Sequence, residues 1–187
     1  MCGRYTLFTD EEYKDIRAII EEVERKHGRG CIKTGEIFPT NVAPILLDAG
    51  SGVTADIAKW GYPSFRGKGF IINARAETAA KKRMFGKSLI TRRCVVPSTG
   101  FYEWDDTKEK RRFTLPDSES LYMAGLYNVY QGERRYVIMT TEANESIINV
   151  HDRMPVIVPY EQIDHWITDT DAAFTIMGRK QPELSIT

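Results

Sequence analysis

Cys2 is the residue of this sequence with the clearest reactive chemistry. Because the second residue is small, we expect a methionine aminopeptidase to remove Met1 and leave Cys2 at the N-terminus. Its α-amine then has an ordinary pKa of about 7.7–8.0, and its thiol one of about 8.5 that the adjacent ammonium lowers. Both groups can add to one aldehyde carbon, first as an imine and then as a thiazolidine ring. The alternative is an incidental second residue with no role.

The segment Asn73-Ala-Arg75 is a second candidate, because it follows the apolar residues 70–72. Residues two apart at a strand end lie on the same side. The Asn73 amide can hold a developing charge on oxygen or a sugar hydroxyl, and the forked donors of Arg75 suit a phosphate. An asparagine at a strand end is also often only a turn residue.

Glu103 lies among aromatic residues in the segment Gly100-Phe-Tyr-Glu-Trp104. In a strand, this pattern indicates a carboxylate that faces a polar cleft. Apolar surroundings raise the pKa of a carboxyl group and make it a plausible acid or base near neutral pH. The alternative is a surface glutamate on the solvent face of an amphipathic strand.

His151 opens the segment His-Asp-Arg153-Met-Pro and is the histidine that we do not expect on a helix. Histidines in loops titrate where acid–base catalysis is useful. His27 and His165 are interpreted as a helix end and a helix surface. Asp152 and Arg153 could simply pair with each other as exposed ions.

The elements that must position these residues are a few helices and many short strands. Thr9 and Glu12 predict a capping box for a helix that ends near Gly28, with Ile16, Ile20 and Val23 on its apolar face. A second helix is expected from Glu77 through Phe85 and a short one over residues 160–167. Strands are predicted at 42–47, 53–60, 94–104, 110–115, 121–130, 134–141 and 154–158. This order predicts an α+β fold, without the regular alternation of a doubly wound sheet.

Composition favours one globular domain over residues 1–187, with 42% hydrophobic and 28% charged residues. No apolar run is long enough for a membrane span, so we expect a cytoplasmic protein with no membrane partner. The three cysteines and three histidines show no metal-ligand spacing, and we expect neither metal nor cofactor. The net charge of zero hides an acidic stretch at 10–24 and a basic stretch at 75–93 that can meet phosphates or form a solvated helix face.

Six motifs in order resemble the SOS response-associated peptidase (SRAP) family: MCGRYT at the start, NVAP at 41–44, WGY at 60–62, INARAET at 72–78, GFYEW at 100–104 and HDRMP at 151–155. The resemblance covers the chain from Cys2 to about Val158. It implies a barrel-like core of largely antiparallel sheets flanked by helices. It also implies a monomer that binds single-stranded DNA at abasic sites and associates with the nucleoid after DNA damage.

The resemblance further implies roles for individual residues. Cys2 is the nucleophile that forms a stable thiazolidine with the lesion aldehyde, and Asn73 orients the lesion sugar. Glu103 shuttles protons, and His151 assists proton transfer. Contacts with DNA are implied for four more residues: Arg4, Arg75 and Arg153 at phosphates, and Trp60 against bases. The peptidase part of the family name implies that Cys2 is exposed by its own cleavage after Met1.

Two other functions are compatible with parts of the pattern. Class II glutamine amidotransferases also begin with Met-Cys-Gly, which leaves an N-terminal-nucleophile amidohydrolase as an alternative. Those enzymes carry an Asn-Gly-Asp substrate loop, and this sequence has no such tripeptide. The other alternative is a non-covalent DNA-binding module in which Cys2 is incidental.

Overall fold

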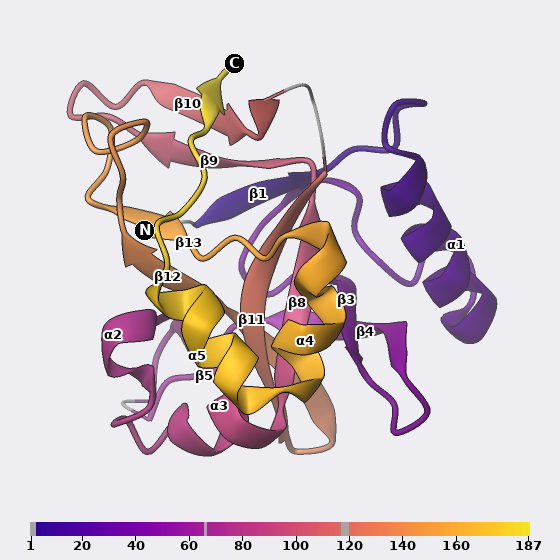
Figure 1. Ribbon diagram of the computed structural model, residues 1–187. Helices are drawn as coiled ribbons and strands as arrows, with labels where there is room; N and C mark the ends of the chain where they lie inside the picture. Colours follow the sequence, from indigo (N-terminus) through magenta and orange to yellow (C-terminus); the bar gives the residue numbers. More distant parts are fainter. Residues whose placement is uncertain (1–2, 66, 117–119) are drawn as a thin grey trace.

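A closed barrel of five strands forms the centre of the protein (Figure 1). The computed structural model describes residues 3–65, 67–116 and 120–187. Around the barrel, each strand is hydrogen-bonded to the next in the order β11 (Leu121–Tyr130), β8 (Arg93–Ser98), β3 (Val42–Asp48), β4 (Val53–Trp60) and β12 (Glu133–Glu142), and β12 returns to β11. The β4–β12 pairing is parallel and the others are antiparallel. The expected α+β fold with a barrel-like core is confirmed.

Strand β8 shows why this barrel needs apolar residues on both strand faces. Cys94 and Val96 belong to one buried cluster together with Trp60. Val95 points to the opposite face and belongs to a second cluster with Trp166 of the C-terminal helices. A strand covered on both faces has a continuous apolar run instead of alternation. This is the pattern Cys-Val-Val in β8.

A second sheet stands beside the barrel. Its strand order is β14 (Ser185–Ile186), β10 (Lys110–Thr114), β9 (Gly100–Trp104), β1 (Arg4–Leu7) and β2 (Gly35–Ile37). All of its pairings are antiparallel. Only Thr99 separates β9 from the barrel strand β8, so this connection fixes the second sheet against the barrel.

Four shorter strands complete the part that carries the candidate residues. They are β5 (Tyr62–Pro63), β6 (Phe70–Ile71), β7 (Asn73–Arg75) and β13 (Arg153–Pro155). β5 and β6 form a hairpin, and both β7 and β13 add to β12. The hairpin therefore leads directly into the strand that carries Asn73.

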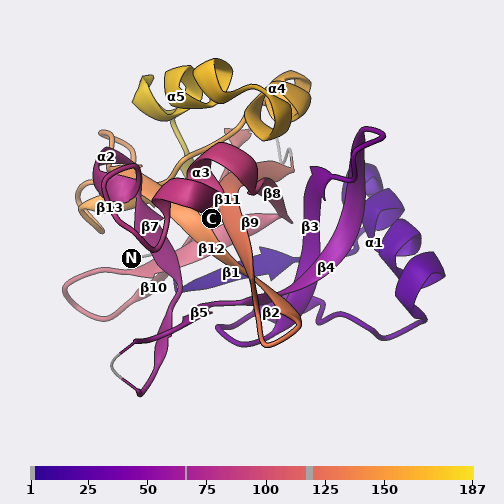
Figure 2. The ribbon, with the colours of Figure 1, turned by 90° about the horizontal axis from the view of Figure 1, so that it is seen from below.

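Helices cover the outside of the barrel on different sides (Figure 2). The longest, α1 (Lys14–His27), packs beside β3 and β4 and buries Ile16, Ile20 and Val23 as predicted. The others are α2 (Ala76–Ala79), α3 (Gly86–Thr91), the 3-10 turn η2 (Tyr160–Gln162), α4 (Ile163–Thr168) and α5 (Thr170–Gly178). Within the described ranges, no helix is both long and apolar enough to cross a membrane.

The predicted start of α1 is wrong. The helix begins at Lys14, and its N-cap residue Tyr13 makes no side-chain capping bond, so Thr9 and Glu12 do not form the expected box. The Tyr13 ring is 4% exposed, and its N–H donates to the Asp10 carbonyl at 3.0 Å. Burial of this ring requires a tight turn where the sequence pattern indicated a helical start.

The predicted second helix is also wrong, because it is two short helices separated by a turn. α2 ends at Ala79 and α3 begins at Gly86. The turn buries Phe85 against Tyr62, with 6.1 Å between ring centroids. It also brings Gly86 so close to the Ala80 carbonyl that a Cβ would lie 2.9 Å from the oxygen. Tertiary burial therefore overrides the helical pattern here.

Candidate functional site

Two short strands bring Asn73, Arg75 and Arg153 to one stretch of β12. Arg75 of β7 and Pro155 of β13 are both register partners of Thr140. A strand has two edges, so β7 and β13 lie on opposite sides of β12. Neighbouring strands are about 4.8 Å apart, which places the two backbones about 10 Å from each other.

A pocket of about 420 Å³ opens at this place. Arg75, Asp152 and Arg153 line it, together with Glu142 and the apolar side chains of Ala143 and Ile148. Arg75 is exposed. The structure thus brings the Asn73-Ala-Arg75 and His-Asp-Arg153 segments, far apart in sequence, to one pocket.

The half-buried imidazole of His151 has two neighbours at one nitrogen. Nδ1 accepts the backbone N–H of Arg153 at 3.0 Å and lies 2.9 Å from Oδ1 of Asp152. The first contact needs an unprotonated Nδ1, and the second becomes attractive when Nδ1 carries a proton. Burial lowers the pKa of His151, which favours the neutral ring with its proton on Nε2. This arrangement presents Nε2 as a hydrogen-bond donor that can change its protonation state.

The buried Arg153 forms an ion pair with the exposed Glu77 that the sequence did not indicate. Its guanidinium donates to both carboxylate oxygens of Glu77, at 3.0 and 2.8 Å, and to the Thr140 carbonyl at 2.7 Å. Partial burial would raise the pKa of Glu77, but the hydrogen bonds from Arg153 lower it to about 2. Arg153 thus pairs with Glu77 instead of with Asp152, the alternative that the sequence had left open. Arg153 was expected to contact a DNA phosphate. Its geometry shows a different role, because the residue is 7% exposed and its guanidinium donates to Glu77.

Glu103 is buried in β9, with 3% of its surface exposed. Burial raises its pKa to about 7, and the negative charge of Asp152 adds to the rise. The interpretation of Glu103 as a surface residue is therefore wrong. Strand β9 pairs with β1, where Tyr102 lies opposite Arg4. Cys2 itself lies outside the described residues, two positions before Arg4 in the sequence.

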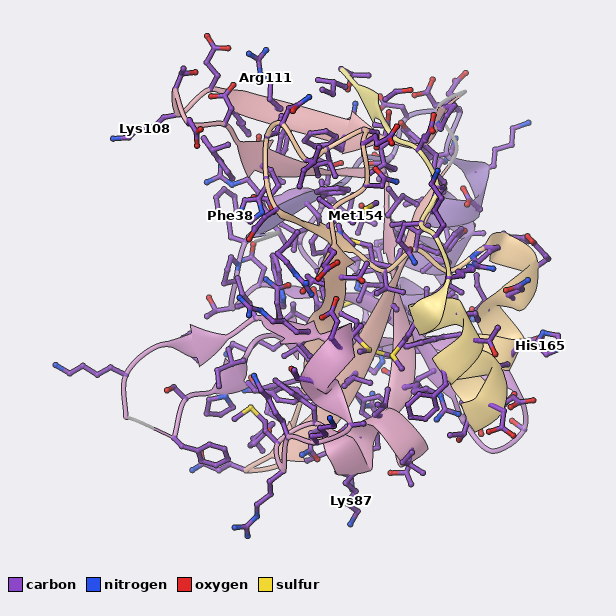
Figure 3. All side chains as sticks on the ribbon, turned by 60° about the vertical axis from the view of Figure 1, so that its left-hand side comes forward. Phe38, Lys87, Lys108, Arg111, Met154 and His165 are labelled. Carbon is purple, nitrogen blue, oxygen red and sulfur yellow. The ribbon has the colours of Figure 1, made fainter. Side chains whose placement is uncertain are left out.

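Arg4 is held between aromatic rings next to this strand pair. Its guanidinium carbon lies 4.2 Å from the centroid of Phe38 and 5.0 Å from that of Trp104. Nη1 is 3.2 Å from a carboxylate oxygen of Glu36, and 27% of the side chain is exposed. Phe38 and the exposed helix residue His165 lie on opposite sides of the molecule in Figure 3, so His165 is remote from this region, as predicted for a helix surface.

The expectation that Trp60 stacks against DNA bases is corrected by its burial. The ring is 0% exposed and lies parallel to Tyr136, with 6.3 Å between centroids. Nε1 donates to the Ile72 carbonyl at 3.0 Å, one residue before Asn73. Trp60 therefore anchors the entry to β7 from inside the core. An indole with both faces covered cannot receive a base.

Sequence reasoning missed two exposed aromatic residues in the hairpin that leads into β7. Phe65 is 82% exposed in the connection between β5 and β6, and Phe70 of β6 is 47% exposed. The Arg135 guanidinium carbon lies 5.4 Å from the Phe70 ring centroid. Aromatic residues between glycines and basic residues just before the Asn73 segment were the available signal.

The described part of the chain offers no obvious metal ligands. No group of three or more histidine, cysteine, aspartate or glutamate side chains gathers among those residues. Cys94 is buried in the barrel, and burial raises the pKa of its thiol. It therefore stays protonated and is a poor ligand or nucleophile.

Comparison with known proteins shows which proteins this chain is similar to in sequence and, separately, in fold. The chain is 36% identical over 195 residues to the abasic site processing protein YoqW of Bacillus subtilis, covering 91% of this chain and 84% of that protein. It is 28% identical over 196 residues to the abasic site processing protein YedK of Escherichia coli, covering 99% and 85%. A crystal structure of a protein from Bordetella bronchiseptica superposes with a TM-score of 0.76 at 21% identity, covering 100% and 98% of the two chains. Residues 1–184 match the family model described as SOS response associated peptidase (SRAP), and the chain therefore belongs to this family.

Proposed function

We propose that this protein captures abasic sites in single-stranded DNA through a covalent thiazolidine between Cys2 and the aldehyde of the ring-opened sugar. The observation that carries the proposal is the buried Glu103, whose pKa is about 7. The negative charge of Asp152, the residue after His151, contributes to this raised pKa. Glu103 lies on the strand that pairs with β1, and β1 follows Cys2 closely in the sequence. The names of the relatives YoqW and YedK, abasic site processing proteins, support the same substrate.

The reaction requires several proton transfers at one place. The Cys2 amine adds to the aldehyde carbon, and the resulting carbinolamine loses water to give an imine. The sulfur then bonds to the imine carbon, and the nitrogen takes up a proton. The sum releases one water and needs no oxidant or reductant. A carboxyl group with a pKa of about 7 is about half protonated at neutral pH, so Glu103 can donate and accept protons in turn.

The other candidate residues bind the DNA around the reacting carbon. Asn73 holds the lesion sugar through its amide, and the Nε2 proton of His151 assists departure or return of the sugar oxygen. The exposed Arg75 contacts a phosphate. The exposed rings of Phe65 and Phe70 take the stacking role first expected for Trp60.

A denaturing gel tests the proposal directly. Purified protein is mixed with an oligonucleotide that carries one abasic site, and an oligonucleotide whose abasic sugar is reduced to an alcohol serves as the control. We expect a covalent band with the aldehyde only, its loss in Cys2→Ala, and a labile adduct in Cys2→Ser because oxygen closes the ring less durably. Intact mass must first show that Met1 has been removed.

Three results would contradict the proposal in different ways. If wild-type protein that has lost Met1 gives no covalent band on the gel, the protein does not form the proposed adduct. An equally strong band with Cys2→Ala would assign the linkage to another residue. Release of ammonia from glutamine without any DNA adduct would favour the amidohydrolase instead.

A further inference from the structure

Glu77 links the two short strands that flank β12. It lies in α2, which follows β7 directly, and its carboxylate accepts hydrogen bonds from the guanidinium of Arg153 in β13, at 3.0 and 2.8 Å. Since β7 and β13 add to opposite edges of β12, this ion pair passes across the strand and brings α2 and β13 side by side (Figure 2). It therefore joins the segment that carries Asn73 to the segment that carries His151.

Several contacts fix this ion pair. The hydroxyl of Thr141 donates to the same carboxylate at 3.0 Å, and Arg153 also donates to the Thr140 carbonyl at 2.7 Å. Paired hydrogen bonds between a guanidinium and a carboxylate are among the strongest and most directional in proteins. Arg153 is 7% exposed, so loss of the Glu77 charge would leave a buried cation without its partner. Glu77 thus decides where the Arg153 side chain lies.

The backbone of Arg153 in turn contacts the imidazole of His151. Its N–H donates to Nδ1 at 3.0 Å, and Oδ1 of Asp152 lies 2.9 Å from the same nitrogen. In a neutral imidazole, one nitrogen carries the proton and the other accepts. The Arg153 N–H requires the proton on Nε2, whereas the Asp152 carboxylate favours it on Nδ1. These two neighbours therefore compete, and the position of the Arg153 N–H decides between them.

The peptide unit between Asp152 and Arg153 carries this N–H and is held from both sides. Its carbonyl accepts the N–H of Ala143 at 3.0 Å. On the other side, the Arg153 side chain is held by Glu77. When Glu77 is replaced, the loop keeps the first contact, but the N–H that faces Nδ1 loses one of its two restraints.

We infer that Glu77 is a positioning residue that acts through Arg153 to hold the proton of His151 on Nε2. The inference rests on the proposed function, in which that proton assists departure or return of the sugar oxygen. A hydrogen bond at one ring nitrogen of a histidine commonly selects which nitrogen carries the proton. Here the donor is a backbone N–H, and a side-chain ion pair across β12 maintains its direction.

Nitrogen NMR of the three histidines tests the inference without DNA. Long-range proton–nitrogen correlation spectra of isotope-labelled protein distinguish a protonated ring nitrogen from an unprotonated one, and a His151→Gln variant identifies the signals of His151. At about pH 8, where an ordinary histidine is neutral, we expect wild-type protein to carry the proton on Nε2. Glu77→Gln should move part of the population to Nδ1, because an amide keeps one acceptor oxygen and turns its NH2 group toward a guanidinium donor.

Two further variants serve as controls. Glu145→Gln removes an exposed negative charge from the β12–β13 connection, outside the ion pair, and should keep the proton on Nε2. Thr141→Val removes only the hydroxyl contact with Glu77, leaves both bonds from Arg153 and should behave like wild type. If Glu77→Gln folds poorly, the wild-type spectrum still decides, because a proton on Nδ1 of the wild-type ring would overturn the inference.

The rates of cross-link formation and reversal provide a second readout. A positioned general acid or base contributes about 10²–10⁴-fold, so Glu77→Gln should slow the step that His151→Ala slows by about tenfold or more at saturating DNA. Non-covalent affinity for an oligonucleotide with a reduced abasic sugar should change no more than in Glu145→Gln. In a His151→Ala background, Glu77→Gln should cause no further slowing, because both residues act through one imidazole. Equal slowing with and without the imidazole would place the action of Glu77 elsewhere and overturn the inference.

The outcomes separate this inference from the proposed function. If wild-type protein without Met1 gives the covalent band, but Glu77→Gln changes neither the proton position nor the rate, the positioning role is wrong and the proposed function stands. If wild-type protein without Met1 gives no band, the proposed function fails, and the spectra still show whether Glu77 sets the position of the His151 proton.

Discussion

Replacement of Glu103 by glutamine tests the electrostatic basis of the candidate site without requiring DNA. The wild-type carboxyl is buried, and its pKa is raised from 4.5 to about 7. Glutamine has nearly the same shape and no titrating proton. The change with pH of the difference in unfolding free energy between wild-type protein and Glu103→Gln therefore reports the cost of ionising this carboxyl group in its folded surroundings.

The size and sign of the effect follow from linkage. One pKa unit corresponds to about 1.36 kcal/mol, so the rise from 4.5 to about 7 is worth about 3 kcal/mol. Below pH 4.5 the carboxyl is protonated in both folded and unfolded protein. Between pH 4.5 and about 7 the folded protein keeps the proton that the unfolded chain releases, so wild-type stability falls relative to the variant as pH rises. Above pH 7 the difference is constant.

Urea unfolding of both proteins at intervals from pH 4 to 9 measures this difference. We expect Glu103→Gln to gain about 3 kcal/mol relative to wild type across the window, while other titrating groups cancel. Glu145→Gln is a matched control on an exposed glutamate, where surface substitutions stay within about 0.5 kcal/mol. A difference for Glu103→Gln that stays flat with pH would refute the argument that burial raises its pKa, and with it the proton-shuttle role.

Three further predictions follow from single residues. His151→Ala should slow formation or reversal of the adduct on the gel but change the unfolding temperature little, because its loop side chain is 25% exposed; a large drop in that temperature would make its role structural. Arg93→Met should lower the unfolding free energy in urea by at least about 3 kcal/mol, because its guanidinium serves carbonyls at the ends of α3 and α4; a loss under about 1 kcal/mol would contradict this. Trp60→Ala should cost about 3–5 kcal/mol of stability as a core truncation, whereas Phe65→Ala should change stability by less than about 0.5 kcal/mol and weaken DNA binding in anisotropy; the reverse order would contradict the assignment of Phe65 as the exposed ring.

Local sequence patterns predicted the strands well, because the alternation or run of apolar residues that marks a strand lies within the strand itself. Residues 42–47 and 53–60 read as strands and became β3 and β4. The apolar spacing of Ile16, Ile20 and Val23 predicted the buried face of α1. Start and end signals failed where burial of one ring, Tyr13 or Phe85, was worth more than a capping bond or a helical turn.

Residue type alone identified most of the candidate chemistry. The amine and thiol of Cys2, the carboxyl of Glu103 and the imidazole of His151 are reactive by their nature. Their type does not say whether a side chain is exposed, and exposure decides what it can do. The resemblance assigned both Trp60 and Arg153 to DNA contacts. The Trp60 ring is, however, wholly buried, and the Arg153 guanidinium is paired with Glu77.

Tertiary structure alone decided which segments share a place and what their surroundings do to them. The β12 strand joins the Asn73 and Arg153 segments because both add to its edges around Thr140, a long-range pairing that no local pattern encodes. The rise in the pKa of Glu103 needs the burial that the packed sheets provide. The sequence by itself thus determined which groups could react, and the fold determined which of them are brought together, desolvated or withdrawn into the core, because burial and charge interactions depend on distance in space.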